Sequence, residues 1–452
     1  MSSTLDPTGQ QKPVTRSVGG VAEPPRNSHL PPLIKATGIT APAAPGVIEE
    51  CGVEPHVLTD LALRLCNTVP RLTSEWAAQQ LRLPLGIVDK IFWQLRDDLL
   101  LEILGQDSGN FRYSITQRGR EYARRLLEVS GYVGPAPVSL EAYAAMLEWQ
   151  MSKQGRPTYE SVRHALGSLV LPDEAVQVAS LAASSGRSLF LFGPSGNGKT
   201  SLGRSLHGVL EGELWIPHCV SVESHVIRIF DPQCHQLLQP STVGDARVDQ
   251  RWMRIRRPMV IAGGEMTIDE LDLAYSPSLR FYEAPPHVKA NGGLFLLDDF
   301  GRQRINSVDL LNRWIIPLEQ HVDYLTLATG QKIRIPFRLM LIVATNLRVD
   351  AISDPAFLRR IGYRVHVDKP DEQRYAEIFR RYVESAGMQM DPGLITTIIQ
   401  RYRDEKRELR ASEPRDLVER CRDICNLKRV APRVDRELLE LAWRGYFGAG
   451  GV

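Results

Sequence analysis

From residue 173 onward, short apolar runs alternate along the chain with stretches of helical periodicity. The runs at 188–192, 294–297, 338–344 and 363–367 are too short for typical helices and contain few polar residues. Such runs are typical of parallel strands that are buried on both faces, and helical stretches separate them. The pattern predicts an α/β domain at residues 161–368, in which helices flank a parallel sheet.

Helical periodicity also appears on both sides of that domain. Residues 54–130 contain a helix, two helices joined by a turn, a pair of strands that read as a hairpin, and a last helix. This order resembles a winged-helix domain. Four further periodic stretches predict a helical lid domain at residues 369–452. Residues 131–160, which are rich in glycine and proline near their start, are predicted to be a linker.

Residues 1–50 lack this patterning. They contain eight prolines and almost no aromatic or periodic positions. Such a segment buries too little apolar area to offset the entropy cost of ordering its backbone. We expect a disordered tail, with a proline-rich docking peptide as the alternative.

Composition changes the picture by excluding several classes of protein. The 452 residues are 43% hydrophobic and 24% charged, which excludes a collagen-like chain and a wholly disordered one. There is no apolar run of 18 residues and no signal-peptide layout at the start, so we expect no membrane insertion. Six cysteines are too few for a disulfide framework and fit the reducing cytoplasm.

Charge bears on whether the chain binds nucleic acid. The 55 Lys and Arg residues nearly balance 53 Asp and Glu residues, and within 54–130 ten basic residues face ten acidic ones. The second helix of the helix-turn-helix pair carries Lys90 and Gln94, but also Asp97 and Asp98. DNA-binding elements normally carry a clear positive excess. Protein docking is therefore favoured for this module, and DNA binding is kept as the alternative.

The strongest chemical signal follows the first apolar run. The loop matches GxxxxGK[ST] between a predicted strand and a predicted helix, and it reads Gly193-Pro194-Ser195-Gly196-Asn197-Gly198-Lys199-Thr200, followed by Ser201. Glycines let backbone N–H groups curl around phosphate oxygens, and the positive end of the helix points at them. We expect Lys199 to reach the β- and γ-phosphates and the Thr200 hydroxyl to ligate Mg²⁺. The motif predicts an ATP and Mg²⁺ site at residues 193–201.

Two carboxylates end the second buried strand. Asp298 and Asp299 directly follow the run at 294–297, at the carboxyl end of the strand, where α/β sheets bind ligands. Hydrolysis by in-line displacement needs a metal anchor and a group that orients water. We expect Asp298 to hold Mg²⁺ through water and Asp299 to polarise the attacking water.

Polar side chains also follow the third strand and precede the fourth. Asn346 is placed to touch a γ-phosphate and the attacking water, and its alternative role is that of a strand-end cap. Arg359 and Arg360 offer planar, permanently charged groups suited to the charge of a transferring phosphoryl group. Their alternative role is a surface ion pair.

These elements, in this order, resemble the AAA+ ATPases over roughly residues 161–447. The resemblance implies that residues 193–200 form the Walker A loop, that Asp298 and Asp299 form Walker B, and that Asn346 is sensor 1. It also implies that an arginine near residue 360 acts on the nucleotide of a neighbouring subunit. Arg360 is the first choice for this arginine finger, and Arg359 is the second.

The lid domain carries the last residue that the resemblance assigns. The segment Glu413-Pro414-Arg415-Asp416-Leu417 looks like a sensor 2 motif, which would place Arg415 on the γ-phosphate. The alternative for Arg415 is a salt bridge at the start of a helix.

The chain also departs from the usual AAA+ pattern. Asp299 stands where the family has glutamate, so efficient hydrolysis is less assured than binding. The 99 residues from Lys199 to Asp298 exceed what a minimal core needs, and a hairpin is expected at 219–230. A second hairpin at 324–335 resembles the pre-sensor 1 hairpin of MoxR-type proteins. As a whole, the chain looks like bacterial chaperone-like AAA+ ATPases associated with Flp-type pilus assembly.

The resemblance implies a cytoplasmic homo-oligomer, with a hexameric ring as the expected form, that hydrolyses ATP to remodel or assemble a macromolecular client. One alternative is a DNA-directed initiator or helicase loader whose winged-helix-like module binds DNA. Another is a nucleotide-gated scaffold with weak turnover, which Asp299 suggests. A zinc site at His218, Cys219, Cys234 and His235 is disfavoured, because alternation puts neighbouring side chains on opposite strand faces.

Overall fold

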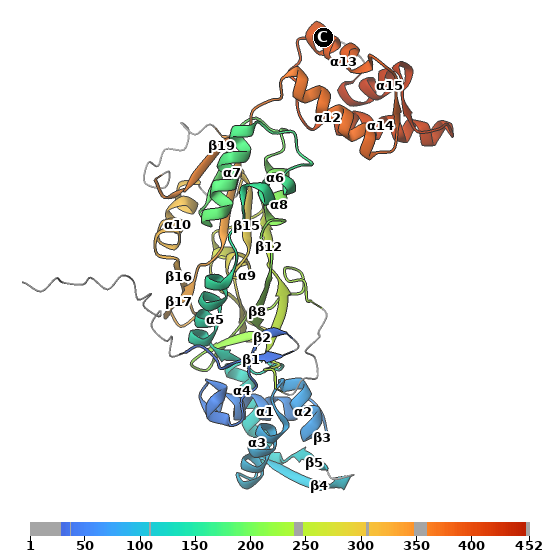
Figure 1. The fold of residues 1–452 in the computed structure, drawn as a ribbon. Coiled ribbons are helices and arrows are strands. Elements are labelled where there is room, and N and C mark those ends of the chain that lie inside the picture. Colours follow the sequence, from blue (N-terminus) through green and yellow to red (C-terminus); the bar gives the residue numbers. More distant parts are fainter. Residues whose placement is uncertain are drawn as a thin grey trace, which may run out of the picture.

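A parallel five-stranded sheet occupies the centre of this computed structural model (Figure 1), which describes residues 29–36, 38–107, 110–238, 247–303, 307–347 and 359–448. All four strand pairs are parallel, in the order β12-β15-β18-β7-β19. The strands are β7 (Leu189–Phe192), β12 (Met259–Ala262), β15 (Leu294–Phe300), β18 (Met340–Thr345) and β19 (Tyr363–His366). Because all five run in one direction, the residues that follow β7, β15 and β18 meet at one edge of the sheet.

Helices cover both faces of this sheet. Leu189 and Leu191 pack on one face against α7 and α8, whereas Phe190 packs on the other face with Trp314 of α10. The flanking helices are α6 (Tyr159–Ala165), α7 (Asp173–Ser185), α8 (Lys199–His207), α9 (Pro286–Lys289) and α10 (Ser307–Gln320). Since both faces are buried, every strand position favours an apolar side chain. The predicted α/β fold with a flanked parallel sheet is confirmed.

The N-terminal module, residues 55–129, has the element order that the sequence predicts. A three-stranded sheet in the order β3-β5-β4 packs on helices around buried Phe92 and Tyr113, whose rings meet edge to face at 4.9 Å. The elements are α1 (Pro55–Cys66), β3 (Leu72–Thr73), α2 (Ser74–Leu81), α3 (Leu85–Asp97), β4 (Leu101–Asp107), β5 (Asn110–Ile115) and α4 (Gln117–Val129). Thr73 and Thr116 cap α2 and α4 through their hydroxyl groups. Helices and a small sheet thus share one core in this module.

A β-rich region lies between the N-terminal module and the parallel sheet (Figure 1). Its strands share one hydrophobic cluster, in which Tyr143, Trp215 and Trp252 are buried. The region comprises β1 (Leu33–Ala36), β2 (Ile39–Pro42), η1 (Ile48–Cys51), β6 (Val138–Ser139), α5 (Leu140–Lys153), β8 (Glu213–Pro217), β9 (Cys219–Val222), β10 (His225–Arg228), β11 (Trp252–Arg256), η2 (Asp269–Leu271), β13 (Ala274–Ser276), β14 (Phe281–Glu283), β16 (Val322–Thr326) and β17 (Lys332–Pro336). The two predicted hairpins are β9–β10 and β16–β17. The second packs its apolar side chains into this cluster.

Two predictions about chain organisation are wrong. The segment predicted as a disordered tail forms the β1–β2 hairpin, in which Ala36 and Ala41 are fully buried and Thr40 accepts a hydrogen bond from the Trp215 indole at 3.1 Å. Residues 1–28, the rest of that tail, lie outside the described residues. The predicted linker contains α5, which buries Tyr143 and Met146. Both segments are ordered by docking on distant strands, which a local pattern does not reveal.

The C-terminal helical domain confirms the predicted lid architecture of four helices. Tyr375, Tyr402 and Trp443 stack edge to face in its core. Its elements are α12 (Glu372–Ser385), β20 (Gln389–Met390), α13 (Leu394–Asp404), α14 (Glu413–Lys428), β21 (Arg433–Val434) and α15 (Arg436–Phe447). Figure 1 shows this domain next to the end of the parallel sheet that lies away from the N-terminal module.

Among the described residues, no helix combines the length and the apolar character needed to cross a membrane. The six cysteines are all free thiols, and five of them are buried.

A buried ion pair joins three parts of the chain and yields a test of the fold. Arg251 and Asp249 have side chains only 4% and 3% exposed, and they pair at 2.8 Å. The Arg251 Nη1 also donates to the Cys51 carbonyl at 2.8 Å and the Pro137 carbonyl at 3.1 Å. Arg251→Ala leaves a buried carboxylate without its partner. We expect the free energy of unfolding to fall by roughly 3–5 kcal/mol.

Denaturant unfolding measures this loss. Arg256→Ala is the matched control, because it removes an exposed guanidinium from the end of β11 and should change stability by less than about 0.5 kcal/mol. Equal stability of the two variants would contradict the predicted role of Arg251.

Candidate functional site

The loop between β7 and α8 has the backbone shape that phosphate binding requires. Gly193 has φ 137°, and a Cβ atom there would lie 2.3 Å from the Val367 carbonyl oxygen. Gly198, with φ 91°, precedes the first turn of α8. The N–H groups at this helix start have no carbonyl partners within the helix and are free to face an anion. The local sequence therefore fixes a loop that curls in front of a helix N-terminus.

Lys199 is held inside this loop by three oxygen atoms. Its Nζ donates to the carbonyls of Gly193 and Pro194, each at 2.8 Å, and to Asn346 Oδ1 at 2.7 Å. The side chain is only 7% exposed. Burial lowers the pKa of Lys199 below its ordinary value, although the nearby carboxylates of Asp298 and Asp299 oppose this shift. A buried cation of this kind is an attractive site for an anionic ligand.

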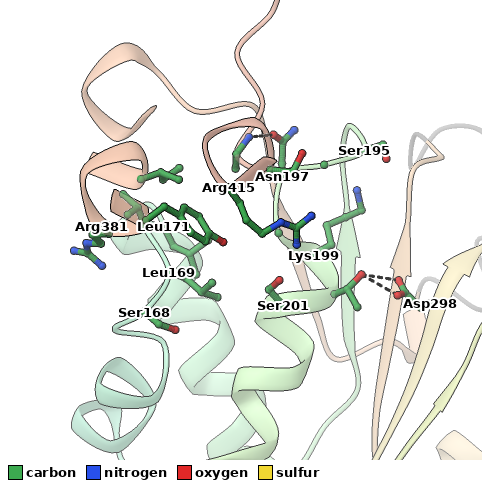
Figure 2. A pocket seen from close by; sticks show the side chains of 18 of the residues that line it. Ser168, Leu169, Leu171, Ser195, Asn197, Lys199, Ser201, Asp298, Arg381 and Arg415 are labelled. Carbon is green, nitrogen blue, oxygen red and sulfur yellow. Dashed lines mark hydrogen bonds between the residues drawn. The ribbon is translucent and has the colours of Figure 1, made fainter. Parts of the chain in front are cut away.

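Thr200 and Asp298 meet across the edge of the sheet. The Thr200 hydroxyl lies 2.8 Å from Asp298 Oδ2 and 3.0 Å from Oδ1 (Figure 2). A hydroxyl and a carboxylate are oxygen donors of the type that Mg²⁺ takes, together with water and phosphate oxygens. These two residues fit the predicted metal site.

Asp299 leaves the regular path of β15. The pairing of β15 with β18 shifts register between Leu297 and Phe300, and Asp299 has φ 50°. Its Oδ1 accepts a hydrogen bond from Asn346 Nδ2 at 3.2 Å. Asn346 therefore bridges the Lys199 ammonium and the Asp299 carboxylate, and it is more than the strand-end cap that its position alone would allow.

A cavity of about 680 Å³ lies between this edge of the sheet and the C-terminal helical domain. It brings together Lys199, Thr200, both carboxylates and Asn346 from the sheet side with Arg415 from α14. Figure 2 shows Arg415 reaching into the cavity toward Lys199. Arg415 also donates to its neighbour Asp416 at 3.0 Å, so the predicted salt bridge and the predicted placement at the site coexist.

One wall of the cavity was not predicted. It consists of the segment 167–171, before α7, together with Ile378, Arg381, Tyr382 and Ser385 of α12. Arg381 donates to the Gly167 carbonyl. Leucine and valine side chains dominate the segment, so this wall offers an apolar surface to a flat ring. The only signal in the sequence was the apolar run Leu169–Leu171 before Pro172.

Arg359 and Arg360 lie outside this cavity in their own chain. Arg360 donates to Glu319 of α10 through Nε and Nη2, each at 3.2 Å, and Arg359 is exposed. Within one chain, Arg360 thus has the surface ion pair that was its alternative role. Ser201 and the loop residues Ser195, Gly196, Asn197 and Gly198 line the cavity, as their positions predict.

The residues weighed for a zinc site have other partners in the structure. Both ring nitrogens of His235 have partners, since Nδ1 accepts from the Asp231 N–H at 2.9 Å and Nε2 lies 2.8 Å from the Lys289 carbonyl. The Cys219 thiol lies 3.3 Å from the Tyr132 hydroxyl. Burial lowers the pKa of His218 to about 4. No group of three metal-ligating side chains of these types occurs in the described part of the chain.

Comparison with family models finds a match in the helical domain. Residues 371–445 match a family model described as a domain of unknown function, DUF8689. No curated protein matches the sequence.

Solved structures with partial likeness include two bacterial proteins. NtrX from Brucella abortus is 15% identical, with a TM-score of 0.39 over 66% of this chain and 59% of that chain. The RuvB Holliday junction branch migration motor of Thermotoga maritima is 12% identical, with a TM-score of 0.37 over 61% and 69%. An NtrX complex with ATP has a TM-score of 0.36, 15% identity and coverage of 71% and 62%. Because identity and TM-score are low, the site is interpreted from its own geometry.

The oxygen pair at the sheet edge yields a test of metal binding. Thr200→Val removes the hydroxyl at nearly constant shape, and Asp298→Asn removes the charge. Affinity for ATP measured in excess chelator should stay the same, whereas the gain in affinity on adding Mg²⁺ should fall about tenfold or more. Titration of a fluorescent ATP analogue with and without Mg²⁺ measures both quantities.

Thr326→Val, on half-buried β16, is the matched control and should leave both affinities unchanged. A loss of affinity that is the same with and without Mg²⁺ would show that Thr200 and Asp298 do not bind the metal.

Proposed function

We propose that this chain is an ATP-binding and ATP-hydrolysing protein of the AAA+ type. The observation that carries the proposal is the convergence of six chemical groups on one cavity: a buried lysine in a glycine-rich loop, a hydroxyl and a carboxylate that pair, a second carboxylate, a bridging amide and a lid arginine. A bare GxxxxGK[ST] match can arise by chance, but this arrangement in space matches the requirements of phosphoryl transfer.

In the proposed reaction, water attacks the γ-phosphorus, and the bond from that phosphorus to the β–γ bridging oxygen breaks. ADP leaves, and a proton of the water passes to Asp299 and then to solvent. Asn346 orients the water and the Asp299 carboxylate, while Lys199 and Arg415 stabilise charge on the phosphate oxygens. Thr200, and Asp298 through water, would hold Mg²⁺, which would supply positive charge to the phosphates.

We further propose that a second copy of the chain completes each site. Arg360 lies outside the cavity of its own chain, at a surface that it shares with Glu319. A guanidinium in this position can act on a nucleotide only across a boundary between protomers. A closed ring satisfies this requirement for every copy, and a hexamer is the proposed form.

For the client, we propose a protein or protein assembly that the ATPase remodels, in line with the resemblance to chaperone-like AAA+ proteins. The exposed face of α3 supports protein docking over DNA binding. It presents Lys90 and Gln94 together with Asp97 and Asp98, and Arg96 is paired with Asp97. The resemblance to pilus-assembly ATPases and the weak-turnover scaffold both stay predictions.

A mixing experiment tests the shared site. Lys199→Ala and Arg360→Ala should each lower the rate of ATP hydrolysis about a hundredfold or more, the first by losing phosphate contacts and the second by losing the finger. An equimolar mixture should regain activity, because a Lys199→Ala subunit can donate its intact Arg360 to an Arg360→Ala neighbour that still binds ATP. Steady-state release of phosphate measures the rate.

Lys332→Ala, which removes an exposed lysine from β17, is the matched control and should keep full activity. Full activity of Lys199→Ala would refute the site assignment. A mixture no more active than the mean of its components would refute the shared site.

Duplex DNA binding separates the proposal from its rival. At low salt and about 10⁻⁵ M protein, where nonspecific DNA-binding proteins are largely bound, the full chain should leave duplex DNA unshifted. Charge balance on the N-terminal module is the physical reason. Gel-shift or anisotropy titration at several salt concentrations measures it. A strongly salt-dependent shift that Lys90→Ala weakens would favour the DNA-directed initiator or loader.

A further inference from the structure

The Walker A loop is fastened directly to the C-terminal helical domain. The Ser412 N–H donates to the Gly196 carbonyl at 2.8 Å, and the Ala411 N–H donates to Asn197 Oδ1 at 3.2 Å. Figure 2 shows this second contact as the dashed line at Asn197. The fit is close, since a Cβ at Gly196 would lie 2.9 Å from the Ser412 hydroxyl. The loop that is proposed to bind phosphates therefore also forms hydrogen bonds to the lid.

Asn197 is placed for this contact and faces away from solvent. Asn197 is only 5% exposed, and its Nδ2 donates a long hydrogen bond to the Pro194 carbonyl at 3.4 Å. One end of the amide therefore holds the loop, while the other end holds the lid. Any of many residues would fit the x position of GxxxxGK[ST] if phosphate binding were its only task.

The segment that Asn197 holds leads directly to Arg415. Ala411 and Ser412 form the turn before α14, and Glu413 begins the helix. Glu413 accepts hydrogen bonds from the Tyr402 hydroxyl at 2.6 Å and the Arg410 N–H at 3.3 Å, in the core of the helical domain. The turn is thus held by the loop on one side and by the domain core on the other. A change in its position moves the start of α14, and Arg415 with it.

We propose that Asn197 is a positioning residue that sets where Arg415 stands over the γ-phosphate. The proposal rests on the function proposed above, in which Arg415 contacts the terminal phosphate. If phosphate binding changes the shape of the loop, the change would reach the lid through the hydrogen bonds of Gly196 and Asn197 to Ser412 and Ala411. The two parts of the apolar wall, residues 167–171 and α12, are joined separately by the hydrogen bond from Arg381 to the Gly167 carbonyl.

A double-mutant cycle tests whether Asn197 acts through Arg415. Asn197→Ala should lower kcat about tenfold in the native background, which corresponds to the loss of one or two hydrogen bonds. It should change kcat less than twofold in an Arg415→Ala background. Affinity for ADP, which lacks the γ-phosphate, should stay within twofold in all variants. Asn426→Ala, which removes the same amide from an exposed position of α14, is the control and should keep native values.

Two results of this cycle would overturn the proposal. One is an equal fractional loss of kcat in both backgrounds, which would mean that Asn197 acts independently of Arg415. The other is a loss of ADP affinity as large as the loss of kcat, which would mean that the loop itself is damaged. Asn197→Ser, whose hydroxyl is too short to reach Ala411, replaces the alanine variant if that variant does not fold.

Hydrogen exchange tests the contact between Asn197 and Ala411 independently of the proposed function. Without nucleotide, the amide of Ala411 should exchange about tenfold faster in Asn197→Ala than in the native chain. Asn197→Asp keeps an oxygen acceptor and should keep the protection. If exchange is unchanged in Asn197→Ala, the proposal that Asn197 holds the lid to the loop is wrong, whatever the ATPase result. A native chain that binds no ATP and hydrolyses none would overturn the proposed function. The exchange rate of Ala411 would still show whether Asn197 holds the lid to the loop.

Discussion

The direction of the sheet strands decides where the groups on the sheet side of the candidate site lie. Because β7, β15 and β18 are parallel, with β18 in the middle, the loop after β7, the carboxylates of β15 and Asn346 after β18 reach the same edge. Asn346 then lies between the other two and bonds to both Lys199 and Asp299. An antiparallel β18 would carry the amide to the opposite edge of the sheet. The chemistry thus depends on topology before it depends on any single side chain.

The same edge concentrates charge that the protein compensates only in part. Lys199 is buried among carbonyl and amide oxygens, and the carboxylates Asp298 and Asp299 partly oppose the lowering of its pKa by burial. Desolvating a cation costs free energy unless anions approach it. Under the function proposed above, the anionic phosphates would be the partners of this cation in a preorganised site.

Sequence patterns predict those parts of the molecule in which local chemistry decides the structure. The glycines of the loop, Asp298 and Asp299 at a strand end, and the helix periodicity of the lid each follow from neighbours along the chain. The β1–β2 hairpin and α5 do not, because their order comes from Trp215 and other residues far away in sequence. Asn197 is intermediate: its position in the motif was evident, but its contact with Ala411 arises only when the lid folds over the loop.

Asp299 shows how backbone geometry can take over a task usually given to side-chain length. A non-glycine residue at positive φ costs on the order of 1 kcal/mol, although aspartate tolerates it better than most residues. The register shift before Phe300 moves the Asp299 backbone off the strand path, and Asn346 fixes the carboxylate at the cavity. We infer that the bulge compensates for the methylene that glutamate would add. Strain at this point therefore supports the proposed role of the Asp299 carboxylate, while the scaffold with weak turnover stays a prediction.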